Sequence, residues 1–274
     1  MMLDRAAQPD EPGATTRPVV RLVDVHKRFG DLIVLDGINL DLQAGKATVV
    51  IGESGSGKSV LLQHIVCLLR PDRGEVHFHD RRIDNLSERE LSEIRPRFGF
   101  LFQLSALFDS MTAGENVAYP LREHTGKSRH EIDRIVREKL AMVGLEDVAG
   151  KMPSQLSGGQ KKRVALARAI ALDPEVILYD EPTTGLDPPR ADEINELIRK
   201  LQQELSVTSV VVTHDMASGC RVADRIVMLH QGEFIFDGAP DAIVQSQDPR
   251  VRAFVEGRCS PDVPRQTKLE KVVS

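Results

Sequence analysis

The eight residues GESGSGKS, at positions 52–59, constrain the fold of this 274-residue chain more than any other stretch. They follow a short apolar run, KATVVI, and precede SVLLQHIVCLL, where apolar residues at 61, 62, 65, 66, 68 and 69 have the spacing of a half-buried helix. A strand, a glycine-rich loop and a helix in this order are the setting of the GxxxxGK[ST] motif, which binds phosphates. The stretch therefore predicts a nucleotide-binding α/β fold.

The motif assigns chemistry to particular positions of the loop. Lys58 is expected to reach the β- and γ-phosphates of a nucleotide, and Ser59 to ligate Mg²⁺. The other loop residues are expected to surround the phosphates: Gly52, Glu53, Ser54, Gly55, Ser56 and Gly57. A glycine–serine turn that precedes a helix by chance is the alternative. It is disfavoured because strand, loop and helix all lie where the motif requires them.

Three further apolar runs predict buried strands: FGFLFQ at 98–103, VILYD at 176–180 and SVVVTH at 209–214. Such strands alternating with helices are typical of a parallel sheet covered on both faces, and ligands of these sheets bind beyond the carboxyl ends of the strands. We therefore expect the polar groups at those ends to converge on one site. They are the 52–59 loop, Gln103, Asp180 with Glu181, and Thr213 with His214.

Two adjacent carboxylates, Asp180 and Glu181, stand at the end of VILYD. Asp180 is expected to hold Mg²⁺ through its bound water, and Glu181 to polarise the water that attacks the γ-phosphate. A solvated acidic turn is the alternative interpretation, but a phosphate loop in the same chain favours the catalytic one. Gln103 and His214 carry little information alone, and their places at strand ends make them candidates as well.

The rest of the chain divides by pattern. Residues 1–18 are polar and predict a disordered lead-in, and 19–45 alternate as in a small antiparallel sheet. Helix formers are frequent from 104 to about 166 and predict an inserted helical subdomain. A hairpin is predicted around Gln231 and Gly232. The predicted globular domain spans 19–245, and 246–274 form a C-terminal extension.

Composition and charge narrow the possible partners. The net charge is −5 without a long basic block, so nucleic acid is not an expected partner. No apolar run approaches the ~20 residues that span a bilayer, and the N-terminus does not look like a signal peptide. Cys67, Cys220 and Cys259 lack pairing or metal-binding spacing and predict free thiols, with Cys67 in the core. We therefore expect a protein that works inside the cell.

Two other polar features are candidate binding sites, of which the first is favoured and the second is not. The stretch QLSGGQ, at 155–160, also precedes a helix-like run and is a second candidate anion site. His77 and His79 would share one face of a strand, but no further ligands accompany them, so a metal site is disfavoured.

The phosphate loop, LSGGQ, YDEPTTGLD and VVVTHD occur in this order, and together they make the chain resemble the ATP-binding cassette ATPases over about residues 19–245. The resemblance implies a RecA-like P-loop core with an antiparallel β-subdomain and an inserted α-helical subdomain. It also implies Mg²⁺-dependent ATP hydrolysis in a head-to-tail dimer, a second copy of the chain helping to enclose two ATP molecules.

The same resemblance implies roles for matching residues. Phe29 would stack on adenine, Gln103 would sense Mg²⁺ and the membrane permease, and His214 would contact the γ-phosphate. Asp187 would belong to the loop that joins the two sites. The helix after LSGGQ would point at the ATP of the other subunit, which answers what the second anion site binds. The residues of that site are Ser157, Gly158 and Gly159.

Within the family, LFQLSALFDSMTAGENVAYPLREHT and GSGKSVLLQHI most resemble ATPases of Mla- and Mce-type lipid transporters. This implies a membrane permease, a periplasmic MCE-domain lipid-binding protein and a small STAS-domain protein as partners, at the cytoplasmic face of the bacterial inner membrane. The permease groove would involve Leu104, Leu107, Phe108, Val117 and Tyr119; alternatively, these residues fill the core of the subdomain. The alternative functions are a small-solute importer ATPase and a soluble cassette ATPase that is not involved in transport.

Overall fold

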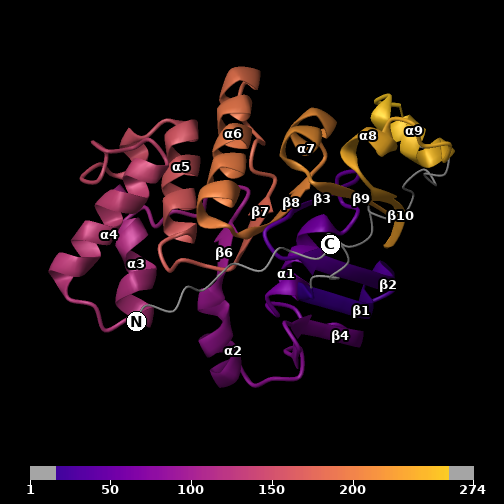
Figure 1. Cartoon of the computed structure of the whole chain (residues 1–274), viewed down its shortest axis with the longest axis horizontal. Helices are drawn as coiled ribbons and strands as arrows, with labels where there is room; N and C mark the ends of the chain where they lie inside the picture. Colours follow the sequence, from indigo (N-terminus) through magenta and orange to yellow (C-terminus); the bar gives the residue numbers. More distant parts are fainter. Residues whose placement is uncertain (1–16, 259–274) are drawn as a thin grey trace, which may run out of the picture.

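A computed structural model describes residues 17–258 of the chain (Figure 1). Most of the predicted lead-in, residues 1–16, and the end of the predicted extension, residues 259–274, lie outside the described part. Within residues 17–258, no helix has the combination of length and apolar character that crossing a bilayer requires.

A six-stranded sheet in the order β10-β9-β3-β8-β7-β6 forms the centre of the molecule. Adjacent strands of this sheet are parallel, except that the edge strand β10 is antiparallel to β9. The five parallel strands are β3 (Ala47–Ile51), β6 (Phe98–Leu101), β7 (Val176–Asp180), β8 (Thr208–Thr213) and β9 (Arg225–His230), and the edge strand is β10 (Glu233–Gly238). The apolar runs predicted as strands therefore lie in one sheet, and the predicted hairpin is β9–β10.

Alternate residues of the same strands pack into two separate cores, because successive side chains of a strand point to opposite faces. On one face, Val49 and Ile51 belong to a core shared with α6 (Pro188–Leu205) and α7 (Met216–Val222). On the other face, Val50 packs with α1 (Lys58–Ile65) and the second sheet. Both faces are thus covered, which is why the strands read as continuous apolar runs.

The second sheet is antiparallel, in the order β2-β1-β4-β5, and lies beside α1 in Figure 1. Its strands are β1 (Pro18–Phe29), β2 (Leu32–Gln43), β4 (Arg73–Phe78) and β5 (Arg81–Arg82). β1 begins one residue before the predicted start of the domain. β1 and β2 meet at a tight turn in which Gly30 has a φ of 57°, a left-handed conformation that glycine adopts readily.

Three helices gather at one end of the molecule: α3 (Ala113–His124), α4 (Arg129–Met142) and α5 (Gly158–Ala169) (Figure 1). Each begins with a capping box, in which a serine or threonine and a residue three positions later satisfy each other's backbone N–H groups. Val117, Leu140 and Val164 from the three helices share one core with the central sheet. The fold is therefore a P-loop core with an antiparallel β-subdomain and a helical subdomain, as predicted.

The predicted extent of the helix after the phosphate loop is wrong. The apolar spacing predicts a helix through residue 69, but α1 ends at Ile65. Cys67 has a φ of 51°, and Leu68 and Leu69 both donate their N–H groups back to Gln63 O. Cys67 is buried as expected, but beyond the end of the helix. The structure also contains four short α-helices that were not predicted: α2 (Glu88–Ile94), α7 (Met216–Val222), α8 (Pro240–Ile243) and α9 (Pro249–Val255).

Candidate nucleotide site

The loops that follow β3, β6, β7 and β8 open into one cleft. Ile51 pairs with Thr213 and Asp180 pairs with Val212, so the residues after these strands leave the sheet at the same edge. The cleft wall contains eight residues that the sequence predicted in the phosphate loop and at the strand ends: Ser54, Gly55, Gly57, Lys58, Ser59, Gln103, Glu181 and His214. Phe29, which the family resemblance implied, and Val34 and Val60, which were not predicted, complete the wall. The structure thus brings together Phe29, the phosphate loop, Gln103, Glu181 and His214.

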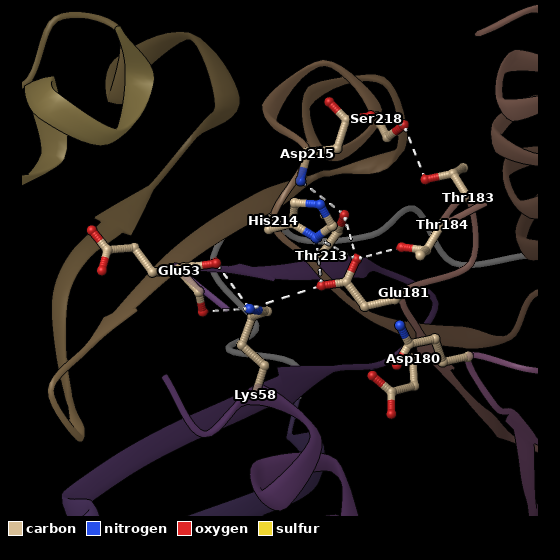
Figure 2. Close-up of polar contacts among 12 residues, drawn as sticks. Glu53, Lys58, Asp180, Glu181, Thr183, Thr184, Thr213, His214, Asp215 and Ser218 are labelled. Carbon is tan, nitrogen blue, oxygen red and sulfur yellow. Dashed lines mark hydrogen bonds and ion pairs between the residues drawn. The ribbon is translucent and has the colours of Figure 1, made fainter. Parts of the chain in front are cut away.

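The phosphate loop depends on its glycines. Gly55 and Gly57 have φ angles of 81° and 102°, and a Cβ built on Gly57 would lie 2.9 Å from Val34 O. The Lys58 side chain folds back, and its Nζ donates to Gly52 O and Glu53 O, both at 2.8 Å (Figure 2). Such a loop offers backbone N–H groups and an ammonium to a phosphate. Within residues 17–258, the buried Ser56 Oγ has no hydrogen-bond partner, as expected for a loop built around a polar ligand.

Ser59 and Asp180 provide two oxygen atoms side by side. The Ser59 hydroxyl donates to Asp180 Oδ1 at 2.9 Å. Burial raises the pKa of Asp180 above its usual value, although the Ser59 hydrogen bond and the Lys58 ammonium oppose this. A hydroxyl and a carboxylate are the hard donors that Mg²⁺ prefers beside substrate phosphates, so these residues fit that ion.

Glu181 occupies a strained position that directs its carboxylate into the cleft. Its φ is 47°, uncommon for a residue with a side chain, and its N–H is held by Val212 O at 2.9 Å. His214 Nδ1 lies 2.9 Å from both carboxylate oxygens (Figure 2). Because a carboxylate only accepts hydrogen bonds, Nδ1 carries the hydrogen. The hydroxyls of Thr184 and Thr213 donate at 3.2 and 3.3 Å, so the carboxylate is fixed from several sides.

Lys58 and Glu181 form a nearly buried ion pair, with 3.8 Å between Lys58 Nζ and Glu181 Oε1. Burial lowers the pKa of Lys58, and the charges of Glu181 and Asp180 oppose that shift. The Lys58 ammonium therefore already has acceptors within its own chain, and it can exchange them for the oxygen atoms of an anionic ligand.

One residue near the cleft was missed by the sequence analysis. Lys162 on α5 is only 5% exposed, and its Nζ donates to Gln103 O at 2.5 Å and to Glu181 O at 3.3 Å. Burial lowers its pKa. The sequence pattern could have identified it. Lys162 stands three residues before Ala165 and four before Leu166, so helical spacing puts it on the same buried face as these apolar residues.

Ser157, Gly158, Gly159 and Asp187 do not line this cleft. Ser157 is exposed and caps α5, accepting from Gln160 N at 3.3 Å. Asp187 is exposed and caps α6, accepting from Arg190 N at 3.2 Å. The two caps are neighbours, since a Cβ built on Gly159 would lie 3.9 Å from Arg190 Cδ. They form a second polar surface outside the cleft.

The described cysteines and the two histidines of the 77–79 stretch do not line the cleft. Cys67 and Cys220 are free thiols, and burial raises the pKa of Cys67 to about 12. Cys259 lies outside the described residues. His77 Nε2 is paired with Glu75 and His79 Nε2 with Glu175, both at 2.8 Å.

P-loop nucleoside triphosphatases combine a glycine-dependent loop and its buried lysine with acidic residues at the end of another strand of the same sheet. The fold and the site together place the protein in that class. A narrower assignment comes from sequence. The ABC transporter family model matches residues 35–184, more than half of the chain. The chain belongs to this family and is an ATP-binding cassette ATPase.

Several relatives are similar over most of their length. The "Intermembrane phospholipid transport system ATP-binding protein MlaF" of Haemophilus influenzae is 45% identical over 83% of this chain and 86% of that protein. The Escherichia coli K12 protein of the same name is 41% identical over 90% and 91%. The "Probable ribonucleotide transport ATP-binding protein mkl" of Mycobacterium leprae is 43% identical over 85% of this chain and 67% of that protein.

Solved structures agree with the fold. The dimeric ATP-binding cassette MJ0796, in a post-hydrolysis state bound to ADP and Pi, superposes with a TM-score of 0.75 at 38% identity and covers 81% of this chain and 98% of that one. The cassette cbiO1 of Clostridium perfringens, part of the transporter complex cbiONQ, gives a TM-score of 0.78 at 28% identity, with 87% and 95% covered.

Proposed function

We propose that this ATPase drives a transporter that moves phospholipid between the inner membrane and the rest of a bacterial cell envelope. The observation that carries the proposal is the similarity to two proteins named for intermembrane phospholipid transport, at 45% and 41% identity over most of both chains. The ATPase would lie peripherally at the cytoplasmic face of the inner membrane. It would act with a permease, a periplasmic MCE-domain protein and a small STAS-domain protein.

The cleft geometry supports a role for each of its polar groups. Glu181 accepts the proton of the attacking water, since its carboxylate is held in place and faces the cleft. His214 and Lys58 stabilise the charge on the γ-phosphate, and the remaining loop N–H groups hold the other phosphates. Phe29, 47% exposed at the edge of the cleft, stacks on the adenine.

Ser59 and Asp180 would hold Mg²⁺, with Gln103 reaching toward it from the end of β6. A bound Mg²⁺ would neutralise charge that develops on the phosphates. The support is that Ser59, in the wall of the cleft, has its Oγ 2.9 Å from Asp180 Oδ1, so two oxygen ligands lie side by side.

A second copy of the chain would complete the site. Ser157, Gly158 and Gly159 are at a helix N-terminus outside their own cleft, beside the cap Asp187. Helix N-termini favour anions, and the related MJ0796 cassette is dimeric, which supports a head-to-tail dimer in which these residues contact the partner's ATP.

An aromatic groove beside the cleft supports a permease contact. It is lined in part by Phe100, Phe102, Phe108 and Tyr119. Leu104 is 90% exposed next to it, while Val117, predicted to share this surface, is fully buried in the core. Exposed apolar patches of this kind mark protein contacts, so the groove would receive the permease.

The test is lipid movement by the assembled complex in vesicles. Labelled phospholipid should move only with ATP and Mg²⁺, and Glu181→Gln should retain ATP binding while turnover and transport fall by about 10²-fold or more. The variant should also remain as an ATP-bound dimer in gel filtration.

Two outcomes would redirect the proposal. Near-normal turnover in Glu181→Gln would remove Glu181 as the base. ATP-driven uptake of a labelled ribonucleotide without lipid movement would favour the activity named for the Mycobacterium relative.

A further inference from the structure

Helix α5 touches two places that matter for ATP hydrolysis. Its first turn carries Ser157 and the following glycines, which lie outside the cleft of their own chain. Little more than one turn later, Lys162 reaches the loops of that cleft, with Nζ 2.5 Å from Gln103 O and 3.3 Å from Glu181 O. A single rigid helix therefore joins a surface for the partner's nucleotide to the catalytic loops of its own chain.

We propose that Lys162 is a positioning residue that transmits the docking of Ser157 on the partner's ATP to Glu181 and Gln103 of its own chain. The inference rests on the proposed role of Ser157 in the partner's site. In the dimer, α5 of each chain then connects one ATP site to the other.

The backbone around Glu181 explains why this lysine matters. A residue with a side chain persists at a φ of 47° only where its surroundings hold it. Val212 O holds the N–H of Glu181 from one side, and the Lys162 ammonium holds its carbonyl from the other. A displacement of α5 therefore acts directly on the peptide that orients the carboxylate, and misplacement of about 1 Å can reduce a rate by about 10²-fold.

A second cation on the same helix reinforces the connection. Arg168 donates to Ser105 O at 2.8 Å and to Ala106 O at 2.7 Å. Both acceptor residues have positive φ angles, 64° and 45°. Together with Lys162, Arg168 attaches the segment after β6 to α5 at two points, so this segment follows the helix when it moves.

Lys139 provides a matched control in the same subdomain. Its side chain is also buried, with 3% exposure, but its ammonium pairs with Asp173 rather than with a loop of the cleft. Lys139→Met and Lys162→Met remove the same charge from similarly buried positions. They differ in whether the catalytic loops lose a partner.

The first experiment compares these variants in the full-length chain assembled with its permease. Lys162→Met should lower kcat about 10- to 100-fold while the KM for ATP changes less than about threefold, because binding groups remain in place. Lys162→Arg should recover much of the rate. Lys139→Met should stay within about twofold of wild type. Equal losses in kcat for the two methionine variants at equal loss of stability would overturn the proposal.

The second experiment tests transmission between the sites with dimers of differently tagged chains. Ser157→Ala and Lys162→Met are placed either in the same chain or in opposite chains. When both changes are in the same chain, they interrupt the same connection, so their combined effect on log kcat should be smaller than the sum of the two single effects. When they are in opposite chains, they interrupt different connections, and the single effects should add. Equal additivity in both arrangements would reject the transmission.

The controls separate this inference from the proposed function. Normal turnover in Glu181→Gln would refute the catalytic assignment, and normal turnover in Ser157→Arg would refute the shared site. If both variants are inactive and Lys162→Met behaves like Lys139→Met, only the role of Lys162 fails.

Discussion

The chain contains two glycine–serine stretches that precede helices, and they form different structures. At 52–59, Gly57 has a φ of 102° and no room for a Cβ, and Lys58 is buried against the carbonyls of its own loop. At 155–160, Ser157 is exposed in an ordinary capping box, and a Cβ on Gly158 or Gly159 would meet only side-chain atoms at 3.9 Å. The first stretch is a closed cradle, and the second is an open helix end.

The difference shows that similar local sequence does not give equivalent sites. The first loop is completed by its own chain, because β7 and β8 bring Asp180, Glu181 and His214 to the same edge of the sheet. In the second stretch, the Cβ positions of Gly158 and Gly159 lie 3.9 Å from Leu186 and Arg190, the residues on either side of the Asp187 cap in the chain. A helix end with this little around it binds an anion well only if something else encloses the ligand. This contrast is what a site shared between two subunits predicts.

The largest expected effect comes from damaging the two stretches in different subunits. Dimers of Lys58→Ala alone or of Ser157→Arg alone should be inactive, since both sites are damaged. In a mixed dimer, one site collects both changes and the other is intact. Random mixing should therefore restore roughly a quarter of all sites.

ATPase turnover and ATP-dependent closure of the mixed dimer should both be measured in assembled complexes with one tagged copy of each variant. Recovery of neither would mean that each chain uses its own LSGGQ stretch, and the comparison between a complete and a shared site would be wrong.

A smaller effect is expected from adding one methyl group to each stretch. Gly57→Ala meets Val34 O at 2.9 Å and a φ of 102°, so the loop must shift. Left-handed strain costs about 1–3 kcal/mol, and nucleotide binding by the isolated chain should weaken about tenfold or more. Gly159→Ala has room, and should change the free energy of unfolding by less than about 1 kcal/mol.

Urea unfolding and binding of a fluorescent ATP analogue by the isolated chain measure both variants. Equal loss of nucleotide binding in Gly159→Ala would show that the second stretch also serves its own cleft.

The smallest expected change in stability comes from Ser157, and it separates the two possible tasks of this residue. Ser157→Ala removes a helix cap and should lower the free energy of unfolding by about 1 kcal/mol. Ser157→Asp can still cap α5 and should retain stability, but its negative charge would face the partner's phosphate and should abolish turnover of the dimer. Thermal unfolding and ATPase activity are the two measurements. Full turnover in Ser157→Asp would reduce Ser157 to a cap.

Much of the architecture was predictable because it depends on local pattern. Continuous apolar runs identified β3, β7 and β8, and Gln231 with Gly232 identified the β9–β10 hairpin. The end of α1 was not predictable in this way. Apolar spacing continues past Ile65, but the chain turns at Cys67 to bury it in the core beneath the antiparallel sheet. The place of Val117 was not predictable either, because an apolar side chain fits a surface groove and a core equally well.

The sequence alone determined the class of protein, because the phosphate loop, the paired acids and LSGGQ are continuous stretches whose order and spacing carry the information. Only the tertiary structure decided how Glu181 is held and that Lys162 joins α5 to the cleft. Lys162 and Gln103 are 59 residues apart, and their contact depends on how the helical subdomain packs against β6 and β7. Hydrogen bonds over such separations follow from the packing of whole elements, and no local pattern encodes them.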